Sequence, residues 1–136
     1  MNENQRRGLE MPSGNLLAVF QDPRVVSCAV GVLGANMLRK AAFKSQRSLF
    51  GVAQELKGRG LVYLAVDKDG NIIKDAQGNP VEVPNAWQNR LLLNLGMVLL
   101  GTVLIGNSKE VTVDYLGLGL ASSGFANVVM TLGKFD

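Results

Sequence analysis

The sequence predicts a mostly α-helical chain with a small β-meander, in which one to three helices span a membrane or lie at its surface. Three observations predict this class. Long apolar runs occupy both halves of the chain, and a polar stretch rich in turn residues separates them. Only 18% of the residues are charged and sixteen are glycine, which is typical of a chain that hides most of its surface. A soluble α+β subunit of an assembly is the alternative, and the modest mean hydropathy of +0.16 favours it.

The 136 residues are enough for one domain with a modest core. Within this single domain we expect four segments. Residues 1–23 form a polar arm, and residues 24–60 form a helix that is first apolar and then basic. Residues 61–84 form the meander, and residues 85–136 hold hydrophobic, glycine-rich segments. The first ten residues are polar and mixed in charge, so no secretory signal is expected.

The second segment is predicted to be helical from residue 24 to about residue 58. Pro23 is suited to the first turn of a helix, with Asp22 as the N-cap. Residues 25–38 are apolar on nearly all sides, but at about 1.5 Å per residue they cover only roughly 21 Å. Because the hydrocarbon core of a bilayer is ~30 Å thick, this part alone is marginal as a membrane span.

Residues 38–56 change character and are predicted to form a basic amphipathic helix. Seven basic residues stand between residues 24 and 60 against a single acid, Glu55, so the positive charge is one block. Four of them fall within an arc of about 140° on a helical wheel. These four are Arg39, Lys40, Lys44 and Arg47. The arc is expected to contact anionic lipid or the phosphates of nucleic acid, and a solvated helix face without a ligand is the alternative.

The third segment changes to a period of two, which indicates strands. We expect strands at residues 61–66, 72–74 and 81–83, joined by two turns rich in Asp, Asn and Gly. The first turn begins like a calcium-binding loop. However, Ile72 and Gly78 stand where that pattern requires a glycine and a glutamate, so a hairpin turn explains the aspartates better.

Residues 86–106 are the best candidate for a membrane span, because as a helix they extend over roughly 31 Å. Aromatic and basic side chains near the ends of such a helix are expected at the membrane–water interfaces. The assigned interface anchors are Trp87, Arg90, Lys109 and Tyr115. Glycines in the apolar segments would let neighbouring helices approach closely. The glycines assigned to helix packing are Gly31, Gly34, Gly96, Gly101 and Gly106.

The last segment fits two structures. Residues 110–115 alternate as a strand would, whereas residues 116–133 are uncharged over 18 residues, which is enough to span a membrane. Four glycines weaken a helix here, and residues 122–124 would suit a turn between two strands. We favour a helix, with a pair of strands as the alternative.

Several chemistries are excluded by residue types that the sequence does not contain. It has no histidine, which removes the commonest general base and the commonest metal ligand. Cys28 is the only cysteine and lies in an apolar run, so neither a disulfide within the chain nor a thiolate metal cluster is expected. We therefore expect no enzymatic activity, no metal and no cofactor.

The sequence favours a small structural membrane protein that scaffolds a membrane-associated protein assembly, such as the lipid layer beneath a virion or a shell lattice. The expected location is the membrane of a virion or the cytoplasmic membrane. The expected partners are membrane lipid, other copies of the chain or a shell protein, with nucleic acid as a further class. The layout is similar, in architecture only, to that of small membrane proteins of icosahedral phages with an internal lipid layer. The alternatives are a soluble capsid or tail-type subunit of a homo-oligomer and a holin-like pore-former.

Overall fold

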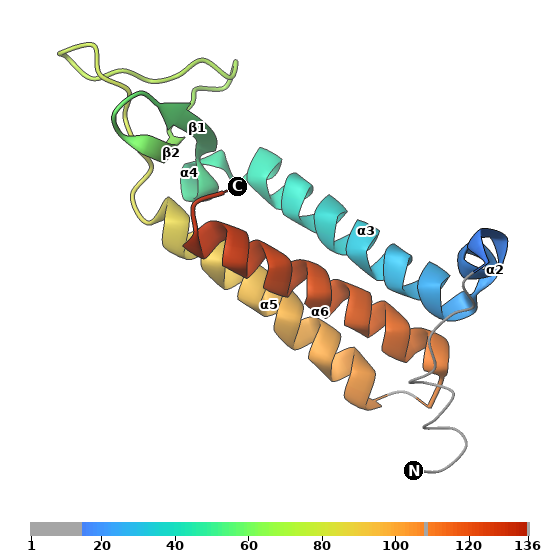
Figure 1. The fold of residues 1–136 in the computed structure, drawn as a ribbon. Coiled ribbons are helices and arrows are strands. Elements are labelled where there is room, and N and C mark those ends of the chain that lie inside the picture. The colour runs from blue at the N-terminus through green and yellow to red at the C-terminus, as the bar shows by residue number, and fades with distance from the viewer. Residues whose placement is uncertain (1–14, 108, 136) are drawn as a thin grey trace.

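The computed structural model describes residues 15–107 and 109–135. It shows a bundle of three long helices with a small unit at one end, residues 46–85, which we call the head (Figure 1). The long helices are α3 (Pro23–Ser45), α5 (Ala86–Asn107) and α6 (Val111–Leu132). Each is long and apolar enough to cross a membrane. The predicted class is confirmed: the chain is mostly helical with a small antiparallel sheet, and it has three helices with the length and apolar composition that a membrane span requires.

Helix α6 lies between the other two long helices, since both α3 and α5 pack extensively on it and touch each other only briefly. Helices α3 and α6 run toward the head and α5 runs away from it (Figure 1). The head end of the bundle therefore holds the last turns of α3 and α6 and the first turn of α5. A short helix, α2 (Leu16–Gln21), is attached at the far end and leaves most of Leu16 and Phe20 exposed.

Glycine allows α3 and α6 to pack backbone against backbone. A side chain at Gly31 of α3 would overlap the backbone of α6 at Leu116 and Leu120. A side chain at Gly119 of α6 would in turn overlap the backbone of Cys28. Close approach through small residues is the usual way in which membrane helices associate, because lipid provides no hydrophobic driving force between them.

The opposite side of α6 packs against α5 in the same way. Gly101 of α5 and Gly117 of α6 face each other, and a side chain on either would overlap the carbonyl of the other. Nearer the head, a Cβ atom at Gly124 would lie 2.7 Å from the carbonyl oxygen of Asn94. Helix α6 thus presents glycine to both neighbours.

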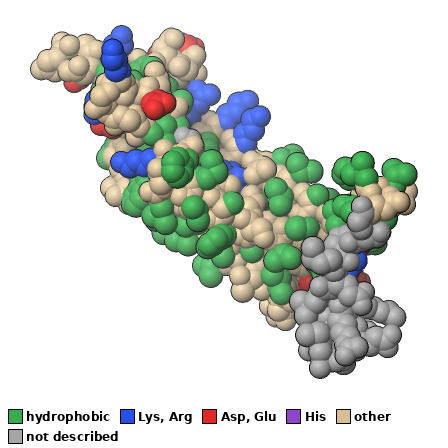
Figure 2. Space-filling view, viewed as in Figure 1, with side chains coloured by type: hydrophobic (Ala, Val, Ile, Leu, Met, Phe, Trp, Pro, Cys, Tyr) green, Lys and Arg blue, Asp and Glu red, His purple; other side chains and the backbone are tan. Residues whose placement is uncertain are grey.

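The interior of the bundle is small, and most large apolar side chains point outward. The buried apolar residues between the helices are Ala35, Met97 and Leu120. On the long helices, five large apolar side chains are at least 60% exposed. They are Leu33, Met37, Leu92, Leu99 and Phe125. Large exposed apolar surfaces of this kind mark contacts with lipid or with another protein. Figure 2 shows hydrophobic side chains spread along the bundle and lysine and arginine gathered toward the head.

The head begins with a one-turn helix, α4 (Arg47–Phe50), followed by an antiparallel hairpin of β1 (Val52–Leu56) and β2 (Gly60–Leu64). Gly51 joins α4 to β1 with a φ of 63°, a left-handed conformation that favours glycine. The Gly51 backbone also lies against Tyr63, leaving no room for a side chain.

Residues 65–81 form two successive turns of identical construction. In the first, the Asp67 side chain accepts hydrogen bonds from the amides of residues 69 and 71; in the second, Asp75 does the same with residues 77 and 79. Three backbone hydrogen bonds of 2.8–3.0 Å then close a ring among Ala65, Ile73 and Val81, which are eight residues apart. This ring makes the two turns a compact unit instead of a flat sheet.

Two details of the predicted elements are corrected by the structure. The helix expected to continue to about residue 58 ends at Ser45, because Gln46 leaves the helical conformation with φ −120° and ψ 53°. Residues 52–56 are strand β1 instead, so the basic amphipathic helix predicted over residues 38–56 was wrong in its second half.

Of the expected meander, residues 60–64 form a regular strand, and residues 66, 72, 74, 80 and 82 take part only in isolated bridges. The glycine-rich segment near the C-terminus is helix α6, the favoured reading.

The predicted polar arm falls partly outside the described residues, which start at residue 15. From there, the side chain of Asn15 caps α2 by accepting the amides of Leu17 and Ala18. Asp22 caps α3 as predicted, with its Oδ1 accepting the Arg24 amide at 2.9 Å, and Pro23 occupies the first turn.

Candidate functional site

A polar cluster lies inside the bundle about two turns below the head. At its centre is Arg39 of α3, which is only 8% exposed. Its guanidinium donates to Asn94 of α5 at 2.8 Å, to Asn36 one turn earlier on α3 at 2.6 Å, and to the hydroxyl of Ser123 of α6 at 3.1 Å. Every one of these acceptors is neutral. The guanidinium of Arg39 therefore has hydrogen-bond partners, but none of these acceptors carries a negative charge to balance its positive charge.

The cluster ties all three helices together at one level. Asn94 also donates to the carbonyl of Arg90 one turn earlier in α5, and the Ser123 hydroxyl donates to Asn36. Arg39 lies six residues before the end of α3, which is about 9 Å along the helix axis. An ionisable residue at this depth of a candidate membrane span marks a functional position by default.

A second buried arginine connects the bundle to the head. Arg90 lies in the second turn of α5 and is 4% exposed. It donates to the carbonyls of Phe50 and Gly51 at 2.8 and 2.9 Å, at the junction of α4 and β1. Its guanidinium also lies 4.1 Å from the ring centre of Phe43 and 4.4 Å from that of Tyr63, so two aromatic faces hold the cation.

Between the last turns of α3 and the underside of the head is an open cavity of about 500 Å³, which we call the junction cavity. Five of its ten lining residues are basic and none is acidic. The basic residues are Arg39, Lys40, Lys44, Arg47 and Arg90. Lys40 and Lys44 are exposed and Arg47 is half-buried. The remaining walls come from Asn36, Phe43 and the start of β1.

The four cations predicted as one arc are therefore brought to one cavity, although not in the way expected. Lys40 and Lys44 occupy the outer face of α3, whereas Arg47 belongs to the separate helix α4. The Nη1 atom of Arg47 lies 3.8 Å from the position that a Cβ atom would take at Gly70, in the turn built on Asp67. Arg39 points inward and is engaged with Asn94, so direct contact with lipid or nucleic acid is not the role its position supports. Arg90, assigned from the sequence as an interface anchor, joins them.

Ion pairs among the described residues lie elsewhere. Arg24 pairs with Asp22 at the far end of the bundle, at 2.6 Å, and Arg59 pairs with Glu82 on the surface of the head, at 2.5 Å. The hydrogen bonds from Arg24 hold the pKa of the Asp22 carboxyl at about 2, below its usual value of 3.8. Within residues 15–107 and 109–135, no group of three or more acidic or cysteine side chains is placed to hold a metal ion.

The predicted packing glycines fall into two sets. Gly31 and Gly101 lie at backbone contacts with α6. Gly34, Gly96 and Gly106 have no other part of the described chain within 4 Å of a Cβ position, so they do not serve packing within the chain. Sequence reasoning missed the glycines of α6 that complete the contacts, because they were taken as evidence against a helix. They are Gly117, Gly119 and Gly124.

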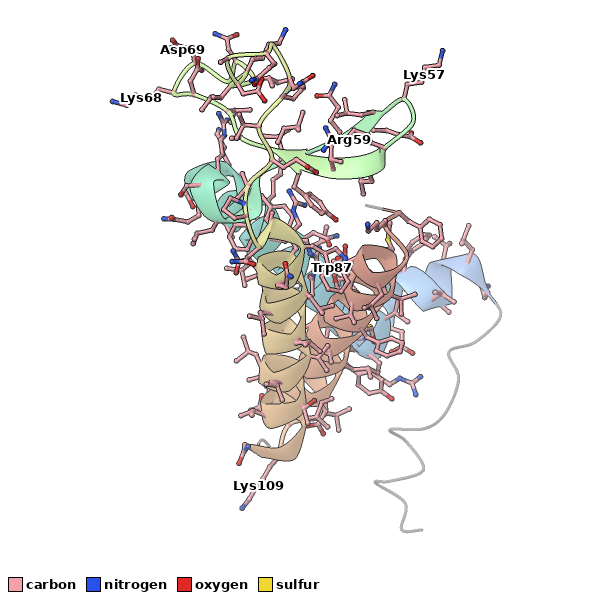
Figure 3. All side chains as sticks on the ribbon, turned by 90° about the vertical axis from the view of Figure 1, so that its left-hand side faces the viewer. Lys57, Arg59, Lys68, Asp69, Trp87 and Lys109 are labelled. Carbon is pink, nitrogen blue, oxygen red and sulfur yellow. The ribbon has the colours of Figure 1, made fainter. Side chains whose placement is uncertain are left out.

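The predicted interface anchors divide between the two ends of the bundle (Figure 3). Trp87 lies at the head end and donates its indole N–H to the carbonyl of Thr131, at 2.8 Å, joining α5 to the end of α6. Lys109 lies at the opposite end, in the connection between α5 and α6, and is exposed. Tyr115 is half-buried near that same end, beside Arg24 and Cys28.

No protein-family model, curated protein or solved structure matches this chain, so the site stands on its own geometry.

Proposed function

We propose that this protein is a small structural membrane protein that scaffolds a membrane-associated protein assembly. The observation that carries the proposal is the division of the molecule into an apolar bundle and a polar head on one end only. Helices of 22 or 23 residues reach about 33 Å, which matches a hydrocarbon core of ~30 Å. Their most exposed side chains are leucine, methionine and phenylalanine, which lipid would cover.

The distribution of charge along the bundle supports one orientation of the protein in the membrane. The head and the adjoining turns carry most of the exposed cations, among them Lys44, Lys57 and Lys68. At the far end, the exposed Lys109 is followed by Glu110 and Asp114. Because basic segments are retained on the cytoplasmic side, the head would face the cytoplasm, or the interior of a virion.

The head supplies the contact surface in this proposal. Its two Asp turns are fixed by their own side chains and project from the bundle, with Lys68 and Asp69 at the tip of the first turn (Figure 3). A rigid, charged surface at the end of an anchor suits repeated contact with copies of the chain or with a shell protein. A structural rather than a catalytic role is part of the proposal, since the polar cluster in the described bundle is built from Arg, Asn and Ser without a base.

The membrane part is tested with Leu99→Arg and Asn107→Arg in the full chain. Leu99 is 67% exposed near the middle of α5, whereas Asn107 ends the helix. If α5 spans, arginine at Leu99 costs about 2.5–3.5 kcal/mol of insertion and arginine at the helix end costs little. We expect wild type and Asn107→Arg to resist carbonate extraction and Leu99→Arg to be released. If all three proteins were instead recovered in the soluble fraction, the result would support the soluble capsid or tail-type subunit.

The scaffold part is tested by cross-linking in the membrane. In a Cys28→Ala background, Lys68→Cys places one thiol at the tip of the head. A homobifunctional maleimide should then join copies of the chain, or the chain and a second membrane-associated protein. A chain that stays monomeric at all cross-linker concentrations would contradict a scaffold. Dye release from vesicles on insertion would favour the pore-former.

A further inference from the structure

We propose that the junction cavity binds the phosphate of an anionic phospholipid headgroup. This inference rests on the proposed membrane location and names the lipid class that the anchor would hold. The cavity combines five cations with no acid in its lining, so an anion is the ligand that its charge favours. Its volume of about 500 Å³ lies in the usual range of about 300–1,000 Å³ for small-molecule sites.

The buried Arg39 supplies fixed positive charge behind the ligand. Its guanidinium is held by Asn36, Asn94 and Ser123. Since these acceptors carry no formal charge, the guanidinium of Arg39 is not neutralised by them. Positive charge that is already oriented does not have to be ordered when the anion binds.

The outer cations are left to contact the phosphate. Lys40, Lys44 and Arg47 line the cavity, and the ion pairs of the described chain are made by other arginines. Lys44 lies in the last turn of α3, where the helix dipole favours a cation. A phosphate group between them would receive charge-assisted hydrogen bonds from more than one side.

A lipid fits this position better than a free anion because of what lies directly below the cations. Residues 33, 37, 40 and 44 fall within one narrow arc of α3, since each step is three or four residues. Leu33 and Met37 are 60% and 71% exposed and lie on the bundle side of Lys40 and Lys44. One stripe of the helix thus changes from apolar to cationic where the bundle meets the head. The acyl chains would lie along Leu33 and Met37 and the phosphate in the cavity.

The test measures lipid binding by purified full-length protein in neutral detergent. Dipalmitoyl phosphatidylglycerol and phosphatidylcholine are titrated separately, and bound lipid is counted by native mass spectrometry. The site variant is Lys44→Gln with Arg47→Gln. The matched control is Lys57→Gln with Lys68→Gln, which removes the same charge from exposed positions of the head that lie outside the cavity lining.

We expect wild type and the control variant to bind phosphatidylglycerol at least about tenfold more tightly than phosphatidylcholine, and the site variant to lose that preference. Unchanged preference in the site variant, or equal loss in the control, would overturn the site. Trp87 fluorescence confirms that each variant has kept the contact between α5 and α6.

Two further measurements distinguish a lipid phosphate from a free phosphate ion and from the phosphates of nucleic acid. Inorganic phosphate at 100-fold excess over lipid should leave phosphatidylglycerol bound; complete displacement would show a site for the free anion. A 20-base-pair DNA that binds wild type more tightly than phosphatidylglycerol, and is lost in the site variant, would assign the cavity to nucleic acid instead. Because the lipid assay is performed in detergent, the two proposals fail separately. A wild-type protein that resists carbonate extraction but shows no preference for phosphatidylglycerol overturns only the site, whereas carbonate release of wild type overturns the proposed membrane anchor.

Discussion

Replacing Gly31 with alanine should separate α3 from α6, whereas the same change at Gly34, one turn away on α3, should not. A Cβ at Gly31 would overlap the carbonyl of Leu116 and the amide of Leu120, and both are backbone atoms of a helix that cannot yield locally. A Cβ at Gly34 meets no atom within 4 Å. The two variants therefore change helix propensity equally and differ only in packing.

The magnitude follows from two opposing effects. Alanine is more favourable than glycine in a helix interior by about 1 kcal/mol, so Gly34→Ala should be neutral or slightly stabilising. Overpacking in a close contact costs about 1–3 kcal/mol, so Gly31→Ala should be net destabilising. Because the gain in helix propensity is common to both variants, we expect them to differ by the packing cost alone, about 1–3 kcal/mol in the free energy of unfolding.

The assay is equilibrium unfolding in mixed dodecylmaltoside and SDS micelles. Trp87 is the single tryptophan of the chain, and its indole is hydrogen-bonded to the end of α6, so its emission reports loss of the bundle. Gly101→Ala and Gly96→Ala form a second matched pair for the contact of α5 with α6. If Gly31→Ala proved as stable as Gly34→Ala, the direct backbone contact between α3 and α6 would be refuted.

Three further outcomes are expected. Asn94→Ala removes the acceptor of the Arg39 Nε and should lower the free energy of unfolding by about 1–3 kcal/mol in the same titration; a change under ~0.5 kcal/mol would contradict the importance of the cluster. Arg90→Met should free the head from the bundle, seen as faster proteolysis within residues 46–85 while helical circular dichroism is kept; unchanged proteolysis would show that other contacts hold the head. The pKa of Asp22 is depressed, so its stabilising contribution should be fully present above about pH 3.8 and lost as the pH falls to about 2, and an NMR titration with a midpoint near 3.8 would contradict the contact with Arg24.

The positions of the three long helices could be predicted from the sequence because they depend on long apolar runs and local caps. Asp22 and Pro23 fix the start of α3 by hydrogen bonding and a fixed φ, both of which are local properties. The end of α3 could not be predicted in the same way. The spacing of Ala53 and Leu56, three residues apart, places both on one face of a helix and on opposite faces of a strand, so it favours a helix. Only pairing with residues 60–64 decides for the strand.

Part of the candidate site could likewise be predicted from the local sequence, whereas the rest depends on contacts between residues that are far apart in the chain. The charge block over residues 24–60 indicated that cations would gather, and the structure brings four of them to one cavity. The inward direction of Arg39 depends on Asn94 and Ser123, which lie 55 and 84 residues from it along the chain. The contribution of Arg90 depends on the carbonyls of Phe50 and Gly51, which lie 40 and 39 residues away. In the same way, the packing role of Gly117 depends on its facing Gly101.

The most direct test of the central claim asks whether the head and the connection between α5 and α6 lie on opposite sides of one bilayer. In a Cys28→Ala background, Lys68→Cys reports on the head and Lys109→Cys on the far end (Figure 3). Each is treated with a membrane-impermeant maleimide in sealed vesicles of known orientation. A membrane scaffold with its head inside predicts that Lys68→Cys is labelled only from the cytoplasmic face and Lys109→Cys only from the other. Labelling of both from the same face, or recovery of both proteins outside the membrane fraction, would contradict it.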